Sequence, residues 1–192
     1  MLSQPLESDA VLAGTKLIAE AWDAAGLYAV GGFVEQADWF AEWNGPFRDD
    51  VRRFVKGDAG MVRTLAARIL GSPDIYQRQD TDINRSINFI TCHDGFTLND
   101  LVSYNHKHNE ANMEDNRDGA NENFSWNCGE EGETDNAEIE ALRLRQIKNF
   151  LTILFLSQGT PMRSWRRIHQ EAPPTILAVM IRDNSRGRVS FR

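Results

Sequence analysis

The sequence predicts an α/β protein built on parallel strands, and two observations carry that prediction. Short apolar runs of strand length alternate with longer segments that have helical periodicity. The run over 86–92, Ser-Ile-Asn-Phe-Ile-Thr-Cys, is almost continuously apolar, as in strands covered on both faces. Such alternation is typical of a parallel sheet or barrel. Only two strands stand out in 192 residues, so the chain is either a small α/β domain or a piece of a larger one.

The expected elements are separated by glycine, proline and asparagine boundaries. A helix is expected to end over 5–13, and a strand to cover 16–19, directly before Glu20. Pro46 suits the first position of a helix that runs to Gly57. The remaining elements are a helix over 60–72, the strand over 86–92, a short helix over 98–104 and a long helix over 137–157.

Between the last two helices lies a polar segment over 105–136, rich in Asn, Glu and Gly. A segment of this length without periodicity is either disordered or a functional loop. Phe124, Trp126 and Cys128 favour a loop, because such side chains would be unusual in a segment left in water.

The composition is that of a soluble globular protein, with 41% hydrophobic residues and a formal net charge of −7. The negative charge argues against nucleic acid and against an anionic membrane as partners. No apolar run is long enough to span a bilayer, and the N-terminal residues lack the pattern of a secretory signal. Cys92 and Cys128 do not make a disulfide framework, so we expect a reduced, cytoplasmic setting.

Two carboxylates stand at the ends of apolar runs, Glu20 after 16–19 and Asp94 after 86–92. In parallel α/β proteins, functional side chains collect at the carboxyl ends of strands. A pair of carboxylates there suits glycoside hydrolysis, which needs a protonated acid and an ionised group opposite the oxocarbenium charge. Nearby aromatic side chains could stack on sugar faces: Trp22, Tyr28, Trp39, Trp43 and Phe96.

Plainer roles stay open for these residues. A strand-ending carboxylate is often a cap or an acceptor that orders a loop, and His93 could be a hydrogen-bonded histidine without a catalytic role. His106 and His108 with Glu110 could ligate a metal, but their spacing matches no known site and a solvated loop is favoured. No metal site is therefore expected.

Six blocks, in order over about 7 to 162, resemble the glycogen debranching and isoamylase group of the α-amylase superfamily, glycoside hydrolase family 13. They are LIAEAWD, EWNGPFRDDVRRFVKGD, GSPDIY, INFITCHDGFTLNDLVSYNHKHNEAN, NRDGANENFSWNCGEEG and LRLRQIKNFLTILFLSQGTPM. The resemblance implies that 1–162 is part of a (β/α)8 TIM barrel, covering about strands five to seven and their helices. It also implies cofactor-independent hydrolysis of α-1,6 branch linkages in glycogen-like glucans by a retaining mechanism.

The same resemblance implies roles for individual residues. Glu20 matches the acid/base residue at the end of the fifth barrel strand. Asp94 matches the transition-state stabiliser at the end of the seventh, and His93 before it is expected to hydrogen-bond sugar hydroxyls. The other expected substrate-binding residues lie near the same rim: Trp22, Trp43 and Asn44.

One part of the family pattern has no counterpart in these 192 residues. The family nucleophile is an Asp at the end of the fourth strand, in a block expected upstream of residue 7. A retaining mechanism needs this Asp roughly 5 Å from the acid, so we expect the chain alone to be inactive without the N-terminal half of the barrel. The alternatives are a non-catalytic glucan-binding remnant and a pseudogene product.

The segment over 163–192 departs from the family. It holds seven Arg and two acidic residues, whereas the preceding part holds 14 basic and 26 acidic residues. Where the family continues with a Gly-Asp-Glu-Phe-like block, this chain reads Trp-Arg-Arg-Ile over 165–168. The codons TGG CGA CGA ATT, read one base later, encode Gly-Asp-Glu, so we expect a frame slip near Met162 and a disordered basic tail.

Overall fold

The computed structural model describes residues 10–12, 14–23, 26–32, 40–77 and 82–163. The expected tail over 163–192 lies outside the described residues apart from Arg163. Most of the expected helix end over 5–13 also lies outside them, and residues 10–12 form a turn. The division into 1–162 and 163–192 therefore stays a prediction.

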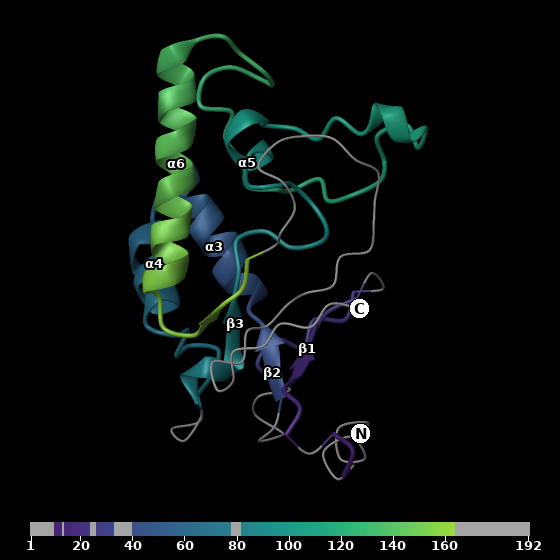
Figure 1. Cartoon of the computed structure of the whole chain (residues 1–192), viewed down its shortest axis with the longest axis vertical. Helices are drawn as coiled ribbons and strands as arrows, with labels where there is room; N and C mark the ends of the chain where they lie inside the picture. The colour runs from purple at the N-terminus through teal and green to yellow at the C-terminus, as the bar shows by residue number, and fades with distance from the viewer. Residues whose placement is uncertain (1–9, 13, 24–25, 33–39, 78–81, 164–192) are drawn as a thin grey trace.

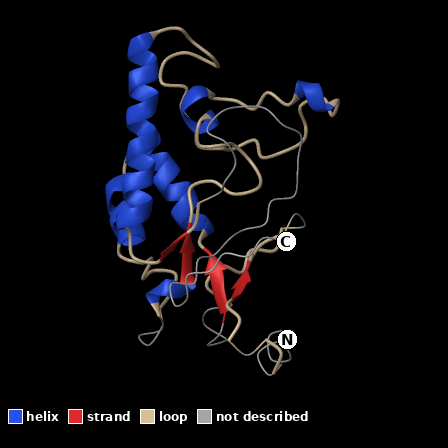
Figure 2. Ribbon diagram, viewed as in Figure 1, coloured by secondary structure: helices blue, strands red, loops and turns tan. Residues whose placement is uncertain are grey.

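The described residues contain a parallel sheet of four strands (Figure 2). The strands are β1 (Leu17–Ala19), β2 (Phe40–Trp43), β3 (Ser86–Asn88) and β4 (Thr160–Pro161). Each strand pairs in parallel with the next one along the chain, so that Leu17 lies opposite Phe40 and Trp43 opposite Ile87. The predicted α/β class with parallel strands is confirmed. The order β1-β2-β3-β4 has no reversal, unlike that of a doubly wound sheet.

The sequence did not predict β2 and β4, for physical reasons. β2 reads Phe-Ala-Glu-Trp, and its Glu42 is fully buried, which a hydrophobic pattern does not indicate. The Glu42 carboxylate accepts a hydrogen bond from the Gly31 backbone N–H. β4 has two residues and includes a proline. β3 is shorter than the predicted 86–92 because ladder pairing covers Ser86–Asn88 alone.

The α-helices of the described part are α3 (Gly45–Lys56), α4 (Met61–Ile69), α5 (Asp100–Ser103) and α6 (Ala137–Leu156), with 3-10 turns η1 (Ile83–Arg85) and η2 (Glu110–Asn112). The α-helices lie where the sequence predicts helices, whereas the two 3-10 turns were not predicted. α3 begins after Asn44, whose side chain accepts from the Phe47 N–H, and ends at Gly57 in a left-handed conformation with φ 97°. Asn136 caps α6 in the same way as Asn44 caps α3.

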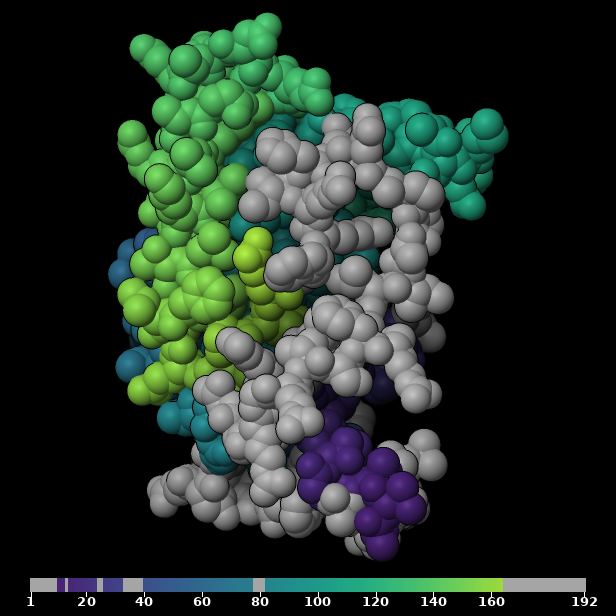
Figure 3. Space-filling view, viewed as in Figure 1, coloured from purple at the N-terminus to yellow at the C-terminus, as the bar shows by residue number. Residues whose placement is uncertain are grey.

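Helices α3, α4 and α6 stand together beside the sheet (Figure 1). In the space-filling view α6 forms one outer edge of the molecule (Figure 3). The inner side chains of these helices make the larger core cluster with residues after β3 and in the loops: Phe47, Val51, Leu65, Ile90, Leu101, Val102, Cys128, Ile147, Phe150 and Leu154.

A second apolar cluster lies on the other side of the sheet, and no described helix contributes to it. Its members are Ala41, Trp43, Ile87, Phe89, Cys92 and Met162, with Ile18 and Trp22 packed against them. Alternation along β2 sends Ala41 and Trp43 to this face and Phe40 and Glu42 to the opposite one. The sheet is therefore apolar on the side without described helices.

Candidate active site

Glu20 and Asp94 lie at the same rim of the sheet. Glu20 directly follows β1, and Asp94 follows β3 after a short run of buried residues. Because β1, β2 and β3 are parallel neighbours, their carboxyl ends meet at one edge. Both residues are exposed. The structure therefore brings the two predicted catalytic carboxylates to one accessible rim.

An aromatic floor lies at this rim, made of Trp22, Trp43 and Phe89. Trp43 ends β2, the strand between β1 and β3, and its ring centroid lies 6.3 Å from that of Trp22 and 5.5 Å from that of Phe89. Trp22 and Phe89 stack with centroids 6.5 Å apart and planes 21° apart. The imidazole of His93 lies 5.6 Å from the Trp43 ring. Three of the predicted substrate-binding side chains thus gather in one cluster.

Arg48 brings a positive charge to the aromatic floor, which the sequence did not predict. Its guanidinium carbon lies 5.7 Å from the Trp22 centroid and 5.6 Å from the Phe89 centroid. Its Nε donates to Asp49 Oδ1 at 2.6 Å. Burial lowers the pKa of Arg48, but the hydrogen bond and charge of Asp49, with the charge of Asp94, raise it overall. Arg48 could have been recognised in the sequence as a candidate site residue, because it lies in the first turn of a helix that begins just after a strand.

Asn44, the fourth predicted substrate-binding residue, is fully buried. Its Oδ1 accepts from the Phe47 N–H at 2.8 Å, and its Nδ2 donates to Ser72 Oγ at 2.9 Å and to Ser86 Oγ at 3.0 Å. Ser86 Oγ donates in turn to Asn88 Oδ1 at 2.9 Å. Asn44 therefore lies beneath the rim, where its hydrogen bonds join β2, α3 and β3.

The Cys92 thiol contacts the predicted catalytic Asp94. It donates a hydrogen bond to Asp94 Oδ1 and lies 3.8 Å from the Asp94 carbonyl oxygen. Burial, together with the hydrogen bond to Asp94, raises the pKa of the thiol to about 12, so the sulfur keeps its proton near neutral pH. Donor atoms of Cys92, His93 and Asp94 lie within 4.8 Å of one another. Within this group, the hydrogen bond from the Cys92 thiol to Oδ1 orients the Asp94 carboxylate.

The polar segment over 105–136 forms a loop fixed by side-chain hydrogen bonds. The Glu131 carboxylate accepts from the N–H groups of Asn105 (2.8 Å) and His106 (3.3 Å) and from Asn127 Nδ2 (3.0 Å), and it lies 3.0 Å from His108 Nε2. Burial acts to raise the pKa of Glu131, but these bonds lower it to about 2. The interpretation of this segment as a loop rather than a disordered stretch is confirmed, and His108 is held by Glu131.

Arg52 ties this loop to the end of β3. Its buried guanidinium donates from Nε to the Ile90 carbonyl at 2.9 Å and from Nη1 to the Asn123 carbonyl at 3.3 Å. Asn123 Oδ1 accepts from the Phe96 N–H at 3.2 Å. Residues on both sides of His93 and Asp94 are therefore held through one guanidinium, whose pKa burial lowers to about 10. An arginine inside an amphipathic helix gives no sequence signal for such a role.

No family model matches the chain. Curated relatives, however, match most of it. The chain is 55% identical over 161 residues to "Isoamylase 3, chloroplastic" of Oryza sativa subsp. japonica, a match that covers 84% of this chain and 20% of the relative. It is 52% identical over 158 residues to the "Glycogen operon protein GlgX homolog" of Mycobacterium tuberculosis, with coverages of 82% and 22%. It is 49% identical over 163 residues to the "Glycogen debranching enzyme" of Erwinia tasmaniensis, with coverages of 84% and 24%.

The chain belongs to the isoamylase group of the α-amylase family. The resemblance found in the sequence is thus confirmed. This isoamylase-group chain spans about a fifth of the length of the curated relatives it matches. In its described part, none of the helices has both the length and the apolar character to cross a membrane. The rice relative is named as chloroplastic, so the cytoplasmic setting stays a prediction.

Proposed function

We propose that this chain is part of a debranching glycosidase that hydrolyses α-1,6 branch linkages in glycogen-like glucans with retention. The observation that carries the proposal is the rim where Glu20, Asp94 and the aromatic floor meet, at the carboxyl ends of three parallel strands. The names of the relatives, isoamylase and glycogen debranching enzyme, support the same activity.

In the proposed mechanism, the two carboxylates have separate roles. Glu20 protonates the oxygen of the leaving chain and then takes a proton from the attacking water. The Asp94 carboxylate stabilises the positive charge that develops on the sugar ring. The Cys92 thiol, which keeps its proton, orients the Asp94 carboxylate by donating to one of its oxygens.

The aromatic floor and His93 hold the sugar. An exposed imidazole beside the Trp43 ring can reach sugar hydroxyls, and the partly buried Trp22 offers an apolar ring edge. For Asn44 we propose a supporting role, because its amide group makes internal hydrogen bonds with Phe47, Ser72 and Ser86. It would order the rim from beneath.

The sheet itself is proposed to be a stretch of a (β/α)8 barrel wall. Sequential parallel pairing, helices on one side and an apolar opposite side are the features of such a wall. β4 would extend the expected strands five to seven to the eighth. The N-terminal half of the barrel is then the partner of this part, and it supplies the nucleophile. The free thiols of Cys92 and Cys128 support a reducing compartment.

A chimera tests this function. The segment of the Erwinia tasmaniensis enzyme that matches this chain is replaced by residues 14–163, and release of reducing ends from glycogen is measured. We expect activity in the chimera and none in the 192-residue chain alone. Glu20→Gln and Asp94→Asn should each lower the rate of the chimera at least about a thousandfold, whereas Glu133→Gln, at an exposed loop carboxylate, should not. Turnover by the chain alone, or an active Glu20→Gln chimera, would refute the proposal.

A second candidate function is glucan binding without hydrolysis. It is favoured by the aromatic floor, whose rings can stack on sugar faces without any reaction. Two results together would support this candidate: the chain binds glucan, and the chimera folds but does not hydrolyse glycogen.

A further inference from the structure

The segment over 91–95 carries His93 and Asp94 but belongs to no helix or strand. It runs from the buried residues after β3 to the turn before α5. The place of a catalytic group in a loop depends on supports outside the loop, and a shift of about 1 Å can slow a reaction roughly hundredfold. The supports of this segment therefore bear on the placement of Asp94.

Arg52 of α3 holds the first end of the segment. Its side chain is buried, and its Nε donates to the carbonyl of Ile90 at 2.9 Å. Burial lowers the pKa of Arg52 to about 10, an effect that the charges of Asp49 and Asp94 oppose. The guanidinium thus stays protonated near neutral pH and keeps its donors.

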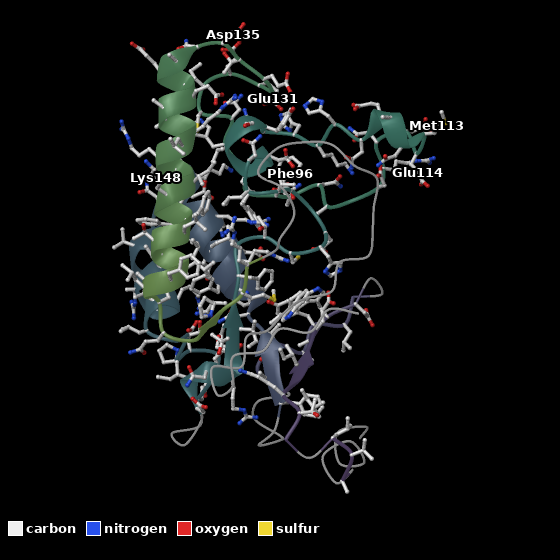
Figure 4. The ribbon with its side chains drawn as sticks, viewed as in Figure 1. Phe96, Met113, Glu114, Glu131, Asp135 and Lys148 are labelled. Carbon is white, nitrogen blue, oxygen red and sulfur yellow. The ribbon has the colours of Figure 1, made fainter. Side chains whose placement is uncertain are left out.

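Asn123 of the polar loop holds the other end. Its side chain is also buried, and its Oδ1 accepts from the Phe96 N–H at 3.2 Å. Its Nδ2 donates to the Ala120 carbonyl at 2.9 Å, which fixes the orientation of the amide group. Figure 4 shows Phe96 within the loops beside α6. The backbone just after the segment is therefore fixed to the loop over 105–136.

A third hydrogen bond joins the two supports. Arg52 Nη1 donates to the carbonyl of Asn123 at 3.3 Å. Ile90 and Phe96 are thus connected through two buried side chains as well as through the segment itself. Each bond is modest by itself, but a connected buried network fixes its members relative to one another.

Gly95 allows Asn123 to come this close. Its φ is +67°, and a Cβ at this position would lie 3.1 Å from Asn123 Oδ1, the atom that accepts from Phe96. A side chain here would strain the backbone and push the amide oxygen away. The residue after Asp94 is therefore suited to the support at Asn123.

We propose that Arg52 and Asn123 are positioning residues for Asp94, which hold the segment over 91–95 at its two ends. Because both side chains are buried, they act through Asp94 rather than by touching the substrate. The catalytic part of the inference rests on the proposed function, since it takes Asp94 as the transition-state stabiliser. It gives the polar loop over 105–136 a part in placing that carboxylate.

A second buried arginine offers a matched control. Arg143 of α6 is buried as deeply as Arg52. Its Nη2 donates to the carbonyls of Asn127 at 3.3 Å and Glu130 at 2.6 Å, on the two sides of Cys128. Each arginine therefore holds a segment that contains one buried cysteine.

Alkylation of the two cysteines by iodoacetamide at pH 8, in the 192-residue chain, tests whether the segment is held. We expect Arg52→Met and Asn123→Ala each to speed alkylation of Cys92 about tenfold, because loss of these hydrogen bonds eases local opening. Cys128 should keep its rate within about twofold in both variants. Arg143→Met should do the reverse, and mass spectrometry of peptides reads each site separately.

Further variants keep this test decisive. Gly95→Ala should act like Asn123→Ala, whereas Asn121→Ala, at an exposed asparagine of the same loop, should change neither rate. The melting temperature of each variant checks its fold. Asn123→Ala leaves the guanidinium and its two carbonyl acceptors in place, so it carries the test if Arg52→Met does not fold.

Hydrolysis of glycogen by the chimera tests the effect on the reaction. Arg52→Met and Asn123→Ala should lower kcat at least about tenfold and keep KM within about twofold, because the aromatic floor still holds the sugar. Arg143→Met and Asn121→Ala should leave kcat unchanged. A support of the fold alone would not separate kcat from KM in this way.

Three results would each overturn the inference. The first is an unchanged rate at Cys92 in folded Arg52→Met and Asn123→Ala chains, and the second is equal acceleration of both cysteines in every variant. The third is an unchanged kcat in both variant chimeras. An inactive unaltered chimera would instead overturn the proposed function, while the alkylation rates still decide whether the segment over 91–95 is held.

Discussion

The imidazole of His93 lies 5.6 Å from the indole of Trp43, with the two planes 54° apart. Trp43 is 8% exposed at the end of β2, and His93 is an exposed residue just before Asp94. The predicted sugar-binding residue His93 therefore packs against a buried ring. Because Trp43 ends β2 and His93 follows β3, the pairing of these two strands helps to position His93 and Asp94.

Replacing that buried ring should destabilise the fold. We expect Trp43→Ala to lower the free energy of unfolding by about 3 to 5 kcal/mol, because it leaves a cavity against Phe89. Trp22→Ala should cost less, since Trp22 is only partly buried in the same cluster. Urea denaturation followed by circular dichroism measures both losses of stability. Equal losses would contradict the conclusion that Trp43 is more deeply buried than Trp22.

The two asparagine caps of α3 and α6 offer a matched comparison. Asn44→Ala removes a cap and two hydrogen bonds to buried serine hydroxyls, so we expect a loss of about 2 to 4 kcal/mol. Asn136→Ala removes a cap on an exposed helix start and should cost about 1 kcal/mol. Unfolding midpoints in urea compare the two variants. A loss at Asn44 no larger than at Asn136 would show that the buried network adds no stability.

The sequence predicted most elements of the fold because periodicity and caps are local signals. Pro46 and Gly57 marked the limits of α3, and the apolar stripe of 137–157 marked α6. β2 was not predicted because its Glu42 is buried, and the hydrogen bond that this carboxylate accepts from Gly31 cannot be read from a local pattern. β4 was not predicted because two residues are too few to form a pattern.

The candidate site was predictable in its carboxylates and not in their supports. Glu20 and Asp94 follow strands, so their shared rim comes from the order of the chain. The supports of Asp94 depend on tertiary contacts: Arg52 reaches a carbonyl before Asp94 and one in the distant loop. The burial of Asn44 also depends on tertiary contacts, because its amide donates to Ser72 and Ser86, which are distant in sequence.

Glu131 should make the loop sensitive to acid. Its pKa in the folded chain is about 2, below the ordinary 4.5, so its stabilising effect is fully present above pH 4.5 and is lost as the pH falls toward 2. Glu131→Gln lacks this effect at every pH. We therefore expect the melting temperatures of the two proteins to differ at neutral pH and to converge between about pH 4.5 and 2. Glu133→Gln, at an exposed neighbour, is the control, and a difference that is constant with pH would contradict the role of Glu131.

The two cysteines should differ in their response to a change at Asp94. Both thiols are buried, and burial raises the pKa of each, so both should react slowly with iodoacetamide at pH 8 in the folded chain and rapidly in guanidinium chloride. The hydrogen bond and charge of Asp94 add to the effect of burial at Cys92. Asp94→Asn should therefore speed alkylation of Cys92 by about three- to tenfold, while Cys128, in the core cluster with α6, should keep its rate. Mass spectrometry of tryptic peptides separates the two sites. Equal acceleration at both would indicate general loosening of the fold, and no acceleration at Cys92 would show that its thiol does not bond to the Asp94 carboxylate in solution.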